Sequence, residues 1–436
     1  MIKRLIVIAI VTGIGHLTTL FSLKYIAKFI DQSTIAFIGE IDSLSLLIVS
    51  IIAFGLQLSS TRNIAIRNDW KAELYETQSA RFTLSIFLML FGVSGFLYTK
   101  NYMFLIAPVI SLNADYALYG RGKPVQGAFV AFVRIVIPSL VLIISSVYFK
   151  DKIVLFFSLS LVFTYLITGF LVSRVLEIPY LITPKLKNLR KYIDNLSIGI
   201  ASFSLFFVGI GIINIMSYFY NSETIAVVYI ALKLYMIFKG VRRIIVQSFF
   251  KELKENKMAL KVDFLALIAG LVFVASVSIY PEVLISTLFE AKYISYTTTF
   301  IILSIAGFIS SFTTSSGTSL LLKEQDMAYS RNLVIAAIVA IIVGIALQMT
   351  VRNEPYLIAI AVLLGEVTIS VLNIKSLGQP GYITERVKKL IIPLLATLVF
   401  VVIKYFFGQT MAAYLISVLL FGSITIVYFL RYLKVS

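Results

Sequence analysis

Long apolar runs, separated by short charged or Gly- and Pro-containing segments, dominate the sequence. A helix needs roughly 20 mostly apolar residues to cross the hydrocarbon core of a bilayer. Fourteen runs of about this length or somewhat shorter predict spans at 5–30, 34–58, 82–98, 102–119, 125–148, 153–173, 196–220, 225–238, 264–280, 299–322, 332–350, 356–374, 390–407 and 411–430. The pattern therefore predicts an all-α, polytopic membrane protein with about 14 transmembrane helices.

The predicted spans fall into two sets of six followed by a pair. The basic segment 174–195, which carries Pro179 and Pro184, separates the sets, and the sets have nearly equal lengths. This suits two repeats of six helices that flank a central pathway. We expect an N-terminal six-helix bundle at 1–173, a cytoplasmic linker at 174–195, a C-terminal six-helix bundle at 196–374 and an additional transmembrane hairpin at 375–436.

Composition supports the membrane interpretation and excludes several kinds of chemistry. Hydrophobic residues make up 59% of the 436 residues and charged residues only 14%, and the mean hydropathy is +0.97. Cys is absent and His16 is the only histidine, which excludes thiol catalysis, disulfides and the usual His/Cys metal sites. Gly120-Arg-Gly-Lys lacks the spacing of a phosphate-binding loop. We expect no cofactor and no metal.

The net charge of +17 reflects orientation in the membrane. Nucleic-acid binding would need a basic face on a soluble fold, whereas here the basic residues lie in short loops, so no nucleic-acid partner is expected. Segments on one side of the predicted membrane hold 28 Lys and Arg residues and those on the other side hold 6. Because positive residues are retained in the cytoplasm, we expect a multi-pass protein of the cytoplasmic (inner) membrane with both termini cytoplasmic.

Charged side chains within the first two predicted spans are candidates for function. Lys24 lies about 9 Å from the outer end of its span, with Lys28 one turn further out. Glu40 and Asp42 lie at a matching depth in the next span, so a structural ion pair with Lys24 is one interpretation. The other is that Lys24 and Lys28 present positive charge to an anionic substrate.

Lys233 is the strongest sequence-based candidate for substrate binding. It lies about 12 Å inside the eighth predicted span, with Tyr229 one turn away and no carboxylate in this span or the preceding one. The preceding span offers Asn214 among other polar residues. The pattern indicates a cation in a neutral polar setting that could attract an anionic head group.

Other buried polar residues leave structural and functional interpretations open. Arg134 could pair with Asp115, at a roughly similar depth, or bind substrate. Glu366 lies near the middle of the twelfth predicted span without an obvious partner and could carry a proton or make a structural hydrogen bond. The hydroxyl-rich run 310–319 is typical of close helix packing.

Two short motifs resemble a known family. The stretch Gly55-Leu-Gln-Leu-Ser-Ser-Thr-Arg-Asn-Ile-Ala65 is similar to the glycine-to-Arg-x-Ile-Ala signature of polysaccharide-repeat flippases, of the O-antigen type, in the multidrug/oligosaccharidyl-lipid/polysaccharide exporter superfamily. Leu112-Asn-Ala-Asp-Tyr-Ala-Leu-Tyr-Gly120 resembles that family's Asp-aromatic-x-x-x-Gly element, with Tyr116 where Trp is common. The span count and loop sizes extend the resemblance over most of the chain.

The resemblance implies a fold and a function. The fold would be two six-helix bundles, as in multidrug and toxic compound extrusion (MATE) transporters, around a cavity that opens alternately to each side. The chain would be a flippase, and not an enzyme, that moves a polyprenyl-diphosphate-linked oligosaccharide repeat unit across the membrane for surface polysaccharide biosynthesis. Expected partners are this substrate, membrane lipids, a proton or sodium ion for coupling, and other polysaccharide assembly proteins.

Two other functions remain open at this point. A cation-coupled multidrug exporter of the same fold would place carboxylates in its cavity, where Lys24, Arg134 and Lys233 instead suggest an anionic head group. A membrane polysaccharide polymerase or glycosyltransferase would need a large extracytoplasmic loop, but the predicted outer loops reach only about twenty residues.

Overall fold

The computed structural model describes residues 2–99, 101–249, 253, 256–351 and 353–435, and every regular element in these ranges is helical. Within them, twelve helices are long and apolar enough to cross a membrane, or up to thirteen spans if one bent pair of shorter helices counts as a span. The predicted all-α, polytopic fold is therefore confirmed, with twelve or thirteen candidate spans beside the predicted number of about fourteen.

The predicted span at 102–119 accounts for most of this difference. It is divided among η1 (Tyr102–Leu105), α5 (Ala107–Ser111) and α6 (Asp115–Gly120). The side-chain oxygen of Asn113 accepts a hydrogen bond of 3.0 Å from the main-chain N–H of Asp115. Such a bond offers the backbone an alternative to a continuous helix. An apolar run thus forms three short helices.

Three other predicted spans are also interrupted. The span at 34–58 becomes α2 (Gln32–Ala53) and α3 (Leu56–Ile66). The span at 196–220 becomes α10 (Leu196–Phe207), η4 (Ile210–Ile212) and α11 (Ile213–Met216), with a bend of 73°. The span at 299–322 becomes α15 (Thr297–Ser311) and α16 (Ser316–Leu322). Each break exposes main-chain groups that need partners from elsewhere in the protein.

The chain forms two compact units. Unit 1 comprises Met1–Phe207 and Gly211–Tyr218, and unit 2 comprises Val208–Ile210 and Phe219–Ser436. Helices α10 and α11 contact α2 and so belong to unit 1, although the sequence groups residues 196–220 with the C-terminal bundle. The bundle boundaries at 173 and 196 remain a prediction from chain length.

In unit 1, α1 packs along α7 and α7 packs along α8. The segment 174–195, predicted as a linker, is folded: Tyr192 donates a hydrogen bond of 2.6 Å to the Ile52 carbonyl, and Lys191 forms ion pairs with Glu73 and Glu76 at 2.9 and 3.1 Å. The remaining elements of unit 1 are α1 (Ile2–Phe29), α4 (Trp70–Thr99), α7 (Pro124–Tyr148), η2 (Lys150–Lys152), α8 (Ile153–Leu176), η3 (Leu186–Leu189) and α9 (Arg190–Asp194).

The turn between α1 and α2 is fixed by Asp31, the N-cap of α2. Its carboxylate accepts hydrogen bonds from Ser33 and from the main chain and side chain of Thr34. These bonds lower the pKa of Asp31 to about 2, chiefly through Ser33. The cap therefore stays ionised, and stabilises the helix start, at any pH near neutrality.

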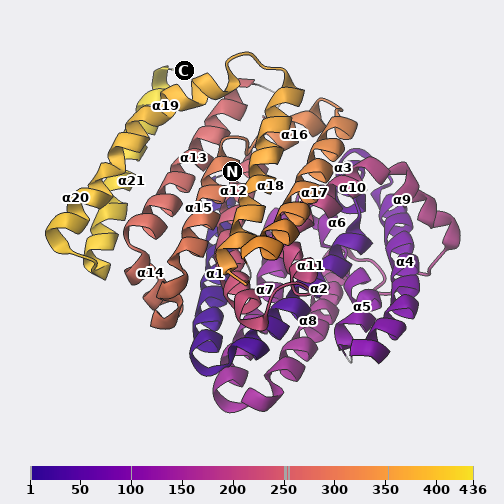
Figure 1. Cartoon of the computed structure of the whole chain (residues 1–436). Coiled ribbons are helices and arrows are strands. Elements are labelled where there is room, and N and C mark those ends of the chain that lie inside the picture. Colours follow the sequence, from indigo (N-terminus) through magenta and orange to yellow (C-terminus); the bar gives the residue numbers. More distant parts are fainter. Residues whose placement is uncertain (1, 100, 250–252, 254–255, 352, 436) are drawn as a thin grey trace. The chain divides into compact units, whose positions relative to one another are not determined.

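In unit 2, α15 and α17 each pack along α18, and α13 packs along α15. The predicted terminal hairpin is present as α19 and α20, which meet at Thr397, followed by α21 beside α20 (Figure 1). The remaining elements of unit 2 are α12 (Ser222–Ser248), α13 (Asn256–Ile279), α14 (Pro281–Leu288), η6 (Ala291–Tyr296), α17 (Asp326–Val351), α18 (Pro355–Leu377), α19 (Tyr382–Ala396), α20 (Leu398–Phe407) and α21 (Met411–Val435).

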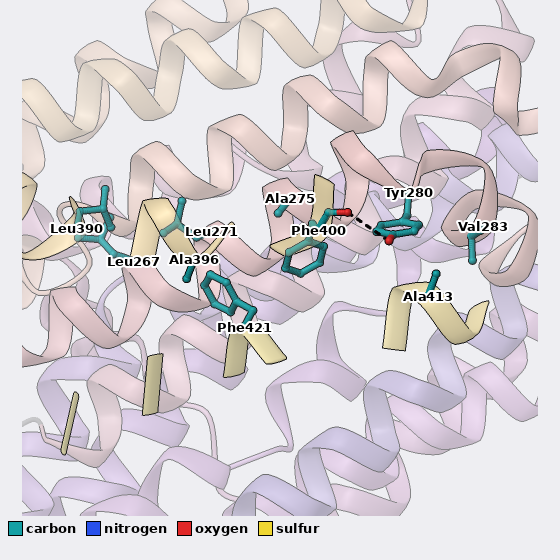
Figure 2. Packing of buried hydrophobic residues seen from close by; sticks show 10 residues of the cluster. All are labelled: Leu267, Leu271, Ala275, Tyr280, Val283, Leu390, Ala396, Phe400, Ala413 and Phe421. Atoms are coloured by element: carbon teal, nitrogen blue, oxygen red, sulfur yellow. Dashed lines mark hydrogen bonds between the residues drawn. The ribbon is translucent and has the colours of Figure 1, made fainter. Parts of the chain in front are cut away.

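A hydrophobic core joins the terminal hairpin to the rest of unit 2. Figure 2 shows Phe400 and Phe421 of the hairpin packed with Leu271 and Ala275 of α13. The Tyr280 hydroxyl donates a hydrogen bond of 3.3 Å to the Phe400 carbonyl. Burial of these large side chains makes the hairpin an integral part of unit 2.

The two motifs that carry the family resemblance pack against each other in unit 1. Helix α3, which holds most of the first motif, contacts α6, which ends the second. The Thr61 hydroxyl donates a hydrogen bond of 3.2 Å to the Tyr116 carbonyl. A Cβ atom added to Gly120 would lie 2.9 Å from the Thr61 carbonyl oxygen. The motifs therefore maintain a close helix contact.

Gly55 occupies the break between α2 and α3, with φ of +79°. A Cβ atom there would lie 2.6 Å from the main-chain nitrogen of Gly199. We expect Gly55→Ala to lower the free energy of unfolding by at least about 1 kcal/mol, because both the conformation and the space disfavour a side chain. Thermal unfolding in detergent measures this loss. Gly13→Ala is the control: a Cβ atom at Gly13 in α1 meets nothing within 4 Å, so equal losses for the two variants would contradict the prediction.

Candidate functional site

Unit 1 contains a buried ion pair between Asp115 and Arg134. Asp115 begins α6, and Arg134 reaches it from α7. The Arg134 guanidinium also lies 5.9 Å from the centre of the Tyr165 ring on α8. The pairing that sequence depth suggested is present in the structure. It places a full positive charge, with its counterion, among three helices of unit 1.

Asn113 positions Asp115. Besides accepting the Asp115 N–H, it donates a side-chain hydrogen bond of 3.0 Å to the Thr168 hydroxyl. Its main-chain carbonyl accepts a bond of 2.7 Å from Arg81. Hydrogen bonds with α4, α6 and α8 thus meet at the break before α6. Together they hold Asp115 in a rigid position.

Arg81 is a buried cation that was not among the sequence-based candidates, because it directly precedes the predicted span 82–98. It is 5% exposed and makes no ion pair with any other described residue. Its neighbours are the Gln78 side-chain oxygen at 2.9 Å and the Tyr116 ring, whose centre is 5.3 Å away. Gln78, Arg81 and Ser85 are all buried at helical spacing, and this polar stripe was the available signal.

Lys24, Lys28, Glu40 and Asp42 are less closely associated than predicted. Lys24 on α1 is half-buried, and Lys28 is exposed with its ammonium 5.2 Å from the Phe29 ring centre. Among the described residues Lys24 forms no ion pair with Glu40 or Asp42, so the predicted structural pair is not formed. The reason is packing: α1 lies mainly along α7, so equal depth does not bring the side chains together. Roles for these four residues in binding or coupling remain predictions.

Glu366 in unit 2 has two partners that its sequence position did not reveal. It is 3% exposed on α18. Its Oε1 atom accepts hydrogen bonds from the Tyr235 hydroxyl and from the Lys239 ammonium, the latter at 2.6 Å. Tyr235 and Lys239 are one turn apart on α12. Lys239 was missed because the basic residues after 238 read as a cytoplasmic segment, whereas α12 continues to Ser248.

Lys233 and Tyr229 also lie on α12. Lys233 is half-buried, with its ammonium 5.5 Å from the centre of the buried Tyr229 ring. Asn214 is on α11 in unit 1, where its side-chain nitrogen is buried and has no hydrogen-bond partner among the described residues. The binding roles of Lys233, Tyr229 and Asn214 remain predictions.

A second buried ion pair in unit 2 has a structural role. Asp263 on α13 is fully buried and accepts bonds of 2.7 and 2.8 Å from the main chain and side chain of Ser315. The Tyr382 hydroxyl and the Arg386 guanidinium on α19 complete its shell at 2.9 and 2.5 Å. The hydroxyl-rich run at 310–319 packs against α18, as the sequence indicated, with Thr313 bonded to Ser370 at 2.9 Å. It also contains the α15–α16 break that Asp263 stabilises. With so many protein partners, this carboxylate is closed to substrate.

The described residues contain no group of three or more His, Cys, Asp or Glu side chains placed to hold a metal ion.

No protein-family model and no curated protein matches this sequence. Several solved structures share its fold at low sequence identity, among them the three described next. The lipid II flippase MurJ, in an inward closed conformation, is similar with a TM-score of 0.70 and 14% identity over 98% of this chain and 99% of MurJ. An inward-facing multidrug-resistance MATE transporter of the MOP superfamily has a TM-score of 0.63 and 12% identity over 88% of this chain and 98% of its own. The eukaryotic MATE transporter AtDTX14 has a TM-score of 0.51 and 13% identity over 88% and 96%.

Proposed function

We propose that this chain is a flippase that moves a polyprenyl-diphosphate-linked oligosaccharide repeat unit across the cytoplasmic membrane by alternating access. The fold similarity to MurJ over nearly the whole chain carries this proposal, because MurJ is described as a lipid II flippase. An ion gradient or the membrane potential would drive transport.

Buried positive charge supports an anionic substrate. Arg81 is surrounded by neutral acceptors, and Lys233 is half-buried against an aromatic ring. A diphosphate carries several negative charges, so cations within the membrane-spanning region would lower the cost of moving it through a low-dielectric medium.

The pairing of carboxylates weighs against a multidrug exporter. An exporter of cationic drugs needs carboxylates available to its substrate, but Asp115 is paired with Arg134, and Glu366 with Lys239. The MATE-like fold and the partly buried Glu40 keep this as the second candidate function. A polymerase or glycosyltransferase has no support in the fold similarities.

Reconstitution in liposomes tests the proposal directly. Purified protein is inserted into vesicles that contain a fluorescent polyprenyl-diphosphate oligosaccharide in both leaflets, and a membrane-impermeant quencher is added outside. Flipping should raise the quenched fraction from about half towards completeness. A protein-free vesicle is the control. Efflux of a cationic dye, with no movement of the lipid-linked sugar, would favour the exporter instead.

The orientation proposed from the basic residues can be tested by labelling single cysteines. Asn68 lies exposed between α3 and α4 in a basic segment proposed to be cytoplasmic, and Lys292 lies exposed in η6, in a segment proposed to face the other side of the membrane. In intact cells an impermeant maleimide should label Lys292→Cys and spare Asn68→Cys. The absence of native Cys makes the background low. The reverse labelling pattern would overturn the proposed topology.

A further inference from the structure

The ammonium of Lys239 in unit 2 lies within a set of oxygen and aromatic groups. It is 2.6 Å from Glu366 Oε1 and 3.3 Å from the main-chain oxygen of Val208. The centre of the Tyr235 ring is 5.0 Å away, and the Tyr235 hydroxyl binds the same Glu366 oxygen. The ammonium is therefore held by a carboxylate, a carbonyl and the face of an aromatic ring.

The Val208 carbonyl is available because the helix is broken there. Val208 follows the end of α10 at Phe207 and precedes the start of η4 at Ile210, within the pair bent by 73°. Carbonyls at a helix end lack their usual main-chain donor. The Val208 side chain is fully buried and lies against the position of Gly365 on α18. This carbonyl is thus fixed beside Glu366.

A carboxylate beside the free carbonyl of a broken helix is the donor set that binds coupling cations in transporters. Carboxylate and carbonyl oxygens are the ligands that hard metal cations prefer. In this chain the positive charge beside Glu366 and the Val208 carbonyl belongs to a side chain of the protein, the Lys239 ammonium. Arg242, the next basic residue on α12, donates hydrogen bonds to Ser310 and Thr314 instead. Lys239 is therefore the cation that contacts Glu366 and the Val208 carbonyl.

We propose that the Lys239 ammonium is a tethered replacement for a bound monovalent metal cation, and that Glu366, Tyr235 and the Val208 carbonyl form a latent sodium or potassium site. This has a consequence for transport, which rests on the proposed function. Transport by this chain would not require sodium to bind at this site, because Lys239 already occupies it. The cation-binding inference itself can be tested without a transport assay, so the two can fail separately.

Thermal unfolding of the full-length protein in detergent, at constant ionic strength in sodium, potassium or choline chloride, tests the inference. The wild-type Tm should be equal in the three salts. Lys239→Ala leaves a buried carboxylate without its counterion, so its Tm should fall in choline. Sodium or potassium should restore a Tm shift of about 3 °C or more that saturates with concentration, whereas choline is too large to enter.

Two further variants make the result specific. Lys239→Met keeps the apolar stem of the side chain and should show the same cation response if the alanine variant is poorly folded. Lys239→Ala combined with Glu366→Gln should lose the response, because the carboxylate charge is gone. Lys388→Ala, at an exposed lysine of α19, is the matched control and should behave like the wild type.

Several results would overturn the inference. One is an equal Tm in all three salts for both Lys239 variants. Another is a wild-type protein that sodium stabilises as much as it stabilises the variants, which would show that Lys239 does not occupy the site. Failure of both variants to fold in any salt also contradicts it, because a bound cation should replace the ammonium.

Discussion

Replacing Asp263 or Arg386 with alanine should destabilise the protein more than any other single change considered for unit 2. Each replacement leaves a buried charge without its partner, at an expected cost of about 3–5 kcal/mol. Asp263→Ala also removes the acceptor for the Ser315 N–H and the Tyr382 hydroxyl. The contact between α13, α16 and α19 should loosen as a result, and the terminal hairpin with it. Thermal unfolding in detergent and protein level in the membrane measure the effect.

A double-mutant cycle distinguishes a specific pair from general sensitivity of this region. The cycle consists of Asp263→Leu, Arg386→Met and the two together. The double variant fills the site with apolar side chains and should cost clearly less than the sum of these two single changes. Glu385→Ala, at an exposed neighbour on the same helix, should change stability by less than about 0.5 kcal/mol. Additive effects of the two single changes would show that the ion pair is not the source of the stability.

Lys233→Gln should reduce polysaccharide export about tenfold or more, while Lys233→Arg keeps most of it. Gln is similar in length but neutral, so it removes the charge that would attract a diphosphate in a low-dielectric medium. Arg keeps the charge and the stacking against Tyr229. The measurement is surface polysaccharide relative to the amount of protein in the membrane.

The control for this change is Lys404→Gln. Lys404 lies near the outer end of the thirteenth predicted span, where a lysine reaches the interface and has no expected role. Export should be unchanged in this variant. Full export by Lys233→Gln would remove Lys233 from the proposed substrate site and leave Arg81 and Arg134 as the cations to test.

The candidate site could be predicted only in part. Pairing of Asp115 with Arg134 was one of two interpretations that the sequence offered, because both lie within predicted spans at roughly similar depth. Lys239 and Arg386 were overlooked because a Lys or Arg after an apolar run reads as a loop residue. Whether such a residue is buried depends on where its helix ends and on which other elements pack over it. The sequence of a single helix does not contain this information.

The pair predicted between Lys24 and Glu40 or Asp42 failed for a related reason. Consecutive spans have matching depths in any hairpin, but depth alone does not make two helices neighbours. In the structure α1 packs along α7, more than a hundred residues away in the chain. Lateral order within a unit follows from the packing of side chains of many helices at once.

The sequence by itself determined that this chain is an all-α membrane protein of many spans. Crossing a bilayer imposes a requirement on each apolar segment separately, so this part of the fold can be read one segment at a time. Only the tertiary structure decided where spans break and which charges meet. Asp263 and Lys239 each bind the main chain at a helix break far away in the sequence. A break is tolerated in a membrane protein because a distant side chain or neighbouring helix satisfies its free N–H and carbonyl groups, and such partners exist only once the helices have packed together.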